Sequence, residues 1–153
     1  MSTPEDRIRE LGLEIPDVVA PLASYVPAAR SGSLVYTAGQ LPIVKGELAA
    51  TGKVGAEIDP ERATELARLC GLNAIAAIRA EIGELSRVRR IVKVVGFVAS
   101  APDFYGQPQV VNGVSDLLGE VFGDAGKHAR SAVGVAVLPR DAPVEVELIA
   151  EVE

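Results

Sequence analysis

The chain ends in "VEVELIAEVE", from Val144 to Glu153, where aliphatic side chains alternate with mostly acidic ones. Successive side chains of a β-strand point to opposite faces of the sheet. One face is therefore wholly aliphatic, and the other carries Glu145, Glu147, Ile149, Glu151 and Glu153. The pattern predicts a strand over residues 144–152 with one buried face. Glutamates on the other face are often only the solvated side of an edge strand.

The preceding segment, residues 129–138, predicts a second strand with two different faces. One face carries Val133, Val135 and Val137, and the other carries Arg130, Ala132, Gly134 and Ala136. Small residues allow close approach to the backbone, and an arginine fork donates two parallel hydrogen bonds to a carboxylate. Arg130 is therefore a candidate anion-binding residue, although an arginine at a strand start more often forms a surface ion pair.

The segment "PRDAP" between these strands predicts a hairpin turn near Asp141. In such a hairpin Glu145 lies opposite Val137, and Arg130 lies about 23 Å from Glu145 at roughly 3.3 Å per residue. The two side chains then act on one small substrate only if a second subunit brings them together. A sheet with helices on one face also leaves valines uncovered, which favours self-association.

Local signals predict the remaining elements. Ser2 or Thr3, Pro4 and Gly12 bound a short first helix, and Asp59, Pro60 and Gly83 bound a long second one. Prolines in residues 14–32 predict extended or turning backbone, and residues 45–58 predict a hairpin or loop. The other predicted elements are strands at 33–38 and 91–100 and a helix from about 108 to 123.

The long helix has one apolar stripe at helical spacing. Its members are Ala63, Leu66, Ala67, Cys70, Asn73, Ala74, Ala77 and Ile78. The strand at 91–100 is almost continuously apolar, which is typical of a central strand covered on both faces. The order of elements predicts one α+β domain over residues 1–153, with helices covering one face of a single sheet.

Composition excludes several classes of function. A formal net charge of −6 and an aromatic content of 4% argue against nucleic-acid binding. Cys70 is the only cysteine and His128 the only histidine, so neither a disulfide nor a zinc site is expected. Cys70 is expected in the core, and His128 in an exposed loop or, alternatively, tuning a site around Arg130. With no signal peptide and no apolar run long enough for a membrane span, we expect a cytoplasmic protein.

Two segments carry a resemblance to a known family. "ARSAVGVAVLP" followed by "VEVELIAEV" resembles the C-terminal signature of the Rid family, the YjgF-type reactive-intermediate deaminases that are also labelled endoribonucleases. "SYVPAARSGSLVYTAGQLP" is similar to its N-terminal signature. The resemblance runs from about Ala20 to the C-terminus, leaving residues 1–19 as an extension that packs on the domain. The segment "VVNGVSDLLGEVFGDAGKHAR" resembles a longer subgroup.

The resemblance implies a chorismate-mutase-like α+β fold, with a mixed sheet and two main helices on one face. It also implies a homotrimer with a central β-barrel and three intersubunit clefts. The implied reaction is hydrolysis of 2-imino or enamine acids, such as 2-aminoacrylate, to 2-keto acids and ammonia, without metal or cofactor. Arg130 would bind the substrate carboxylate and Glu145 would position water. Tyr25 and the backbone at Ala38, Gly39 and Ala132 would contact the substrate.

The chain departs from the family pattern at Ala38, Ala132 and Gly134, where many members have serine, cysteine and glutamate. The missing thiol excludes cysteine nucleophilic catalysis. The family's helix asparagine corresponds to Asn112 or Ser115. Two other functions stay open: non-catalytic binding of keto acids in the same cleft, and an endoribonuclease activity that the charge disfavours.

Overall fold

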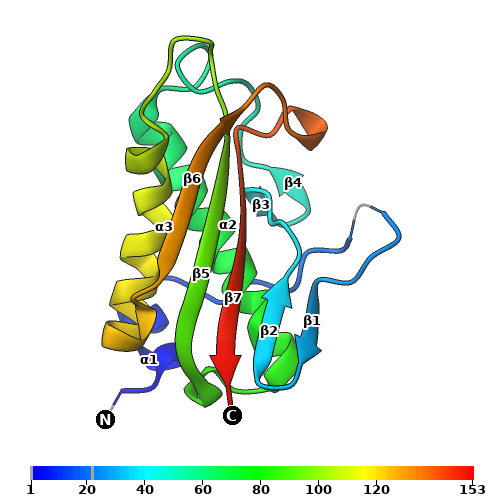
Figure 1. Cartoon of the computed structure of the whole chain (residues 1–153), viewed down its shortest axis with the longest axis vertical. Helices are drawn as coiled ribbons and strands as arrows, with labels where there is room; N and C mark the ends of the chain where they lie inside the picture. The colour runs from blue at the N-terminus through cyan, green and yellow to red at the C-terminus, as the bar shows by residue number, and fades with distance from the viewer. Residues whose placement is uncertain (1, 22) are drawn as a thin grey trace.

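The computed structural model describes residues 2–21 and 23–153, so Leu22 of the predicted extended segment lies outside it. Its main helices are α1 (Pro4–Glu10), α2 (Pro60–Ile82) and α3 (Gln107–Phe122). The strands are β1 (Ala28–Ser31), β2 (Leu34–Thr37), β3 (Ile43–Val44), β4 (Glu47–Leu48), β5 (Val88–Ala99), β6 (Ala129–Val135) and β7 (Val144–Val152). Five strands form one sheet in the order β1-β2-β7-β5-β6, and β3 pairs with β4 in a separate hairpin (Figure 1).

The helix boundaries follow the local signals. The Asp59 side chain accepts a hydrogen bond from the Arg62 backbone N–H, Pro60 is the first helical residue, and Gly83 ends α2. The predicted stripe of α2 is buried throughout. Thr3 caps α1 as predicted. Helix α1 contacts the rest of the domain, since Ile8 is fully buried and Glu5 accepts a hydrogen bond from the Leu85 N–H.

The predicted hairpin of the last two strands is wrong. Strand β5 lies between β6 and β7, pairing in parallel with β6 and antiparallel with β7. Helix α3 crosses from the end of β5 to the start of β6, and such a crossover returns the chain parallel to its first strand. The connection from β6 to β7 spans residues 136–143, which is longer than a tight hairpin turn and carries the chain past the end of β5.

The two faces of the sheet differ in burial. Helices α2 and α3 cover one face (Figure 1), and the aliphatic face of β7 is buried beneath them as predicted. The opposite face carries no helix: Val95 and Phe97 on β5 are only half-buried there. The prediction that this strand is covered on both faces therefore fails within one chain. Among the described residues, no helix is long and apolar enough to span a membrane.

Candidate functional site

Glu145 lies near the start of β7 on the face of the sheet without helices. It is in register with Phe97 of β5. A Cβ built on Gly39 would lie 2.0 Å from Oε2 of Glu145, so the carboxylate rests directly against a bare backbone. Burial, and secondly the charge of Glu147, raises the pKa of the Glu145 carboxyl. A carboxylate in this setting is a stronger base than an ordinary glutamate.

The chain opposite Glu145 is held at both ends of a short gap in the β2–β7 ladder. Before the gap, Oγ1 of Thr37 accepts a hydrogen bond from the Leu148 N–H at 3.0 Å. After it, the backbones of Gln40 and Val146 exchange hydrogen bonds of 2.7 and 3.0 Å. Gly39 lies within the gap, so its position is set by anchors on either side.

The gap leaves one backbone donor beside the carboxylate. The Ala38 N–H donates to the Pro27 carbonyl at 2.8 Å. No hydrogen bond is made by the Gly39 N–H within the part of the chain that the structure describes. Of these two neighbours, Gly39 is therefore the one with an N–H available to a ligand.

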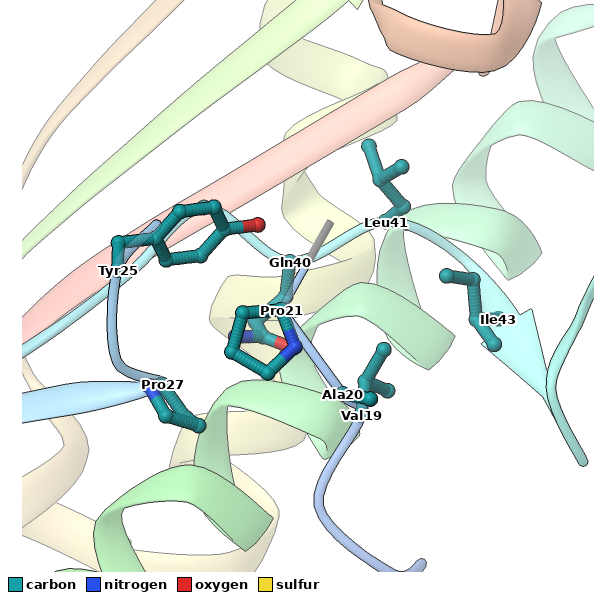
Figure 2. Close-up of a pocket in the computed structure, with 9 residues that line it drawn as sticks. Val19, Ala20, Pro21, Tyr25, Pro27, Gln40, Leu41 and Ile43 are labelled. Carbon is teal, nitrogen blue, oxygen red and sulfur yellow. The ribbon is translucent and has the colours of Figure 1, made fainter. Parts of the chain in front are cut away.

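An open groove of about 850 Å³ lies over these groups, lined in part by Tyr25, Ala38, Gly39 and Glu145. Tyr25 lies at the edge of this groove and is 46% exposed. A second cavity borders Tyr25 on the side of Pro21 and Gln40 (Figure 2). Its volume is about 20 Å³, which is enough for a water molecule only. The groove is thus the space near Glu145 that suits a small substrate.

Arg130 lies elsewhere, on β6, with its side chain against α3. Its Nη1 donates to Oδ1 of Asn112 at 2.7 Å and to Oγ of Ser115 at 3.2 Å. Its Nη2 donates to the Pro108 carbonyl at 3.2 Å. Asn112 and Ser115, the two candidates for the family's helix asparagine, thus both contact the guanidinium. Arginine has five N–H groups. Among the described residues, the Nε–H and one Nη2 hydrogen have no acceptor.

The structure places Arg130 and Glu145 on opposite faces of the sheet, which the sequence did not predict. Arg130 is in register with Val94, and Glu145 with Phe97, three positions further along β5. An odd offset places the two side chains on opposite faces of the sheet. The register puts their Cα atoms about 14 Å apart, in place of the 23 Å expected for a hairpin. The two groups cannot meet in one chain.

His128 lies in the loop before β6, beside Arg130 as the alternative prediction had it, and it is not exposed. The side chain is half-buried, with Nε2 2.8 Å from Oγ of Ser115 and Nδ1 2.6 Å from the Gly126 carbonyl. His128, Ser115 and Arg130 border a shallow groove of about 370 Å³. The spacing of two residues between His128 and Arg130 was the available signal, because such residues share one side of an extended chain.

The departures at Ala132 and Gly134 lie on the same face of β6 as Arg130. Ala132 packs against the core. A Cβ on Gly134 would lie 2.7 Å from Nε2 of Gln107, which donates to Oγ of Ser100. The Gln107 side chain fills the space that a glutamate at residue 134 would need.

Cys70 is a core residue, as predicted. It is fully buried, and burial raises the pKa of its thiol well above the ordinary value, which keeps it protonated. In residues 2–21 and 23–153, no three side chains among His, Cys, Asp and Glu are arranged to hold a metal ion.

Comparison with known proteins places this geometry in a family. The model described as "YjgF/chorismate_mutase-like, putative endoribonuclease" matches residues 5–152. The chain belongs to this family. The YjgF chorismate-mutase-like α+β fold inferred from the two signatures is thereby confirmed.

Two known proteins match the chain over most of their length. Protein TCP17 of Trypanosoma cruzi is 41% identical over 145 residues, covering 94% of this chain and 91% of that protein. A 2-iminobutanoate/2-iminopropanoate deaminase of Dermatophagoides farinae is 31% identical over 134 residues, covering 87% and 89%.

Two solved structures are also similar. The protein Atu1372 from Agrobacterium tumefaciens, of unknown function, has a TM-score of 0.93 and 45% identity over 99% of this chain and 94% of its own. Escherichia coli TdcF with bound serine has a TM-score of 0.64 and 26% identity over 100% and 98%.

Proposed function

We propose that this protein hydrolyses 2-imino acids and their enamine tautomers, such as 2-aminoacrylate, to 2-keto acids and ammonia. The observation that carries the proposal is that the chain presents two complementary half-sites. One is a guanidinium with two N–H groups left for a carboxylate, and the other is a carboxylate beside a backbone N–H with no partner in the described chain. The name of the Dermatophagoides farinae relative and the serine bound to TdcF support a substrate of amino-acid type.

Each group of the two half-sites has a defined role in the reaction. Arg130 binds the substrate carboxylate through two parallel hydrogen bonds, which fixes the position of the imine carbon. Glu145 takes a proton from a water molecule as that water attacks this carbon, and the C=N π electrons move to nitrogen, which then takes this proton from the Glu145 carboxyl. In the resulting carbinolamine, Glu145 moves the hydroxyl proton to the amino nitrogen, so that the C–N bond breaks, ammonia leaves and the C=O bond forms. The Gly39 N–H is available to hold the attacking water or the developing alcohol.

The half-sites come together between two copies of the chain. Because Arg130 and Glu145 lie on opposite faces, β6 of one copy has to meet the β2–β7 groove of the next. The face without helices has apolar side chains for such a contact, including Tyr36 and Val133 at 43% and 44% exposure. Exposed apolar surface of this kind favours association. We therefore propose a homotrimer with a central barrel, as the family resemblance implies.

Mixing two inactive variants tests the shared site. Arg130→Ala and Glu145→Gln are each expected to hydrolyse imine, generated in place by an amino-acid oxidase, at less than about 1% of the wild-type rate. When the two are unfolded and refolded together in equal amounts, a cleft is intact only if an intact Arg130 faces an intact Glu145. Random assembly then restores about a quarter of the wild-type activity.

The outcome also separates the proposal from its alternatives. Activity that fails to recover while both variants stay oligomeric would place Arg130 and Glu145 in different sites. If the wild-type protein binds 2-ketobutyrate in a thermal-shift assay but does not accelerate imine hydrolysis, the cleft is a non-catalytic binding site. Full activity of the Arg130→Ala variant on its own would refute the mechanism.

A further inference from the structure

A chain of hydrogen bonds links His128 to Arg130, and its direction follows from the groups involved. The Gly126 carbonyl only accepts, so Nδ1 of His128 carries the hydrogen in their 2.6 Å contact. Nε2 of the neutral ring then offers a lone pair, and the Ser115 hydroxyl donates to it across 2.8 Å. The Ser115 oxygen is left to accept from Nη1 of Arg130 at 3.2 Å.

The imidazole decides which way the Ser115 hydroxyl points. If Nε2 did not accept its hydrogen, the hydroxyl would rotate freely, and in some rotamers its hydrogen would face Nη1 of Arg130. With the hydrogen held by His128, both Nη1 hydrogens of the guanidinium have fixed acceptors, Ser115 and Asn112. The Pro108 carbonyl takes a third hydrogen, on Nη2. The guanidinium is thereby fixed in one orientation.

We propose that His128 is a positioning residue, which acts through Ser115 to keep the two remaining N–H groups of Arg130 aimed at the substrate carboxylate. The inference rests on the proposed function, because it assigns Arg130 the carboxylate. His128 itself donates to Gly126 and accepts from Ser115, so it is placed to orient the guanidinium and not to bind substrate. Its position at the edge of β6 ties the orientation of Arg130 to α3.

Two substitutions of His128 separate its two hydrogen bonds. A glutamine side chain ends near the position of Nε2, so His128→Gln keeps an acceptor for Ser115 and loses the bond to Gly126. An asparagine ends near Nδ1, so His128→Asn keeps the donor to Gly126 and loses the acceptor. We expect His128→Asn to raise KM about 5- to 10-fold and His128→Gln by less than about 3-fold, since one hydrogen bond is worth roughly this much.

The kinetic pattern distinguishes positioning from general structural damage. The carboxylate is held equally in the ground and transition states, so kcat should stay within about twofold. The dissociation constant of 2-ketobutyrate, measured by calorimetry, should rise in parallel with KM. Ser115→Ala should match His128→Asn, and the double variant should be no worse than either, because both substitutions break the same chain of hydrogen bonds.

Each possible result decides the question. Glu81→Gln, at an exposed residue near the end of α2, serves as the control and should leave KM unchanged. Equal KM values for His128→Gln and His128→Asn, or additive effects with Ser115→Ala, would overturn the positioning role. If Arg130→Ala inactivates the protein while both His128 variants behave as wild type, this inference alone fails. If Arg130→Ala is fully active, the proposed function fails with it.

Discussion

Replacing Gly39 with alanine tests whether the backbone at this residue has to stay bare for Glu145 to act. The added Cβ would lie 2.0 Å from Oε2 and 2.8 Å from Cδ of the Glu145 carboxylate. Ordinary van der Waals contact starts at 3.4 Å. The carboxylate therefore has to move by about 1 Å or more, away from the place where the proposed mechanism needs it.

We expect Gly39→Ala to lower kcat strongly and to change the free energy of unfolding only slightly. A reacting group displaced by about 1 Å lowers the rate about 100-fold, so kcat for imine hydrolysis should fall by about that factor. The clash involves the end of a flexible side chain, and Gly39 is not among the glycines with positive φ. The free energy of unfolding, measured in urea, should therefore change by less than about 1 kcal/mol.

A control and a second variant isolate the cause. Glu81→Gln changes an exposed residue of α2 that lines neither groove, and it should keep kcat within about twofold. Glu145→Ala removes the three side-chain atoms that the added Cβ would meet, Oε2, Cδ and Cγ. Gly39→Ala should thus slow Glu145→Ala no further. If Gly39→Ala alone keeps more than about a third of the wild-type kcat, the contact with Glu145 does not control catalysis.

Two further predictions concern pH and stability. Glu147→Gln removes a charge that raises the pKa of Glu145. Because Glu145 acts as a base only when ionised, a lower pKa shifts the acid limb of kcat/KM to lower pH, whereas an unmoved limb would assign it to another group. Asn73→Leu leaves the carbonyls of Leu41 and Ile43 without the 3.0 Å bonds they now receive from Nδ2. It should lower the free energy of unfolding in urea by about 2–3 kcal/mol, and a loss under about 0.5 kcal/mol would contradict this account.

The elements that sequence predicted well depend on local interactions. The bounds of α2 follow from Asp59, Pro60 and Gly83, which act within one turn of the helix ends. The two faces of β7 follow from strict alternation, which holds wherever the strand lies in the sheet. Such signals need no knowledge of the neighbouring strands. The half-site around Glu145 was accessible to sequence reasoning largely through the family resemblance.

The features that sequence missed depend on neighbours distant in the chain. "PRDAP" is compatible with a hairpin, and nothing local states that β5 separates β6 from β7. Strand β1 was missed because its short run of small and polar residues directly after Pro27 resembles a loop, and only pairing with β2 makes it a strand. The burial of His128 depends on Ser115, which α3 brings within hydrogen-bond distance. All three concern which partner a segment meets, a property of the tertiary fold.

The placement of the two half-sites also restricts how copies of the chain can assemble around the proposed cleft. In a twofold dimer each subunit uses one and the same surface, so that surface would have to include both Arg130 and Glu145. The two side chains point to opposite faces of the sheet, and one contact surface cannot cover both. The β6 side of one copy must instead meet the groove side of the next. A head-to-tail contact of this kind either closes into a ring or grows into a filament. In the proposed assembly a closed ring would contain as many complete clefts as subunits, whereas the single chain contains only the two separate half-sites.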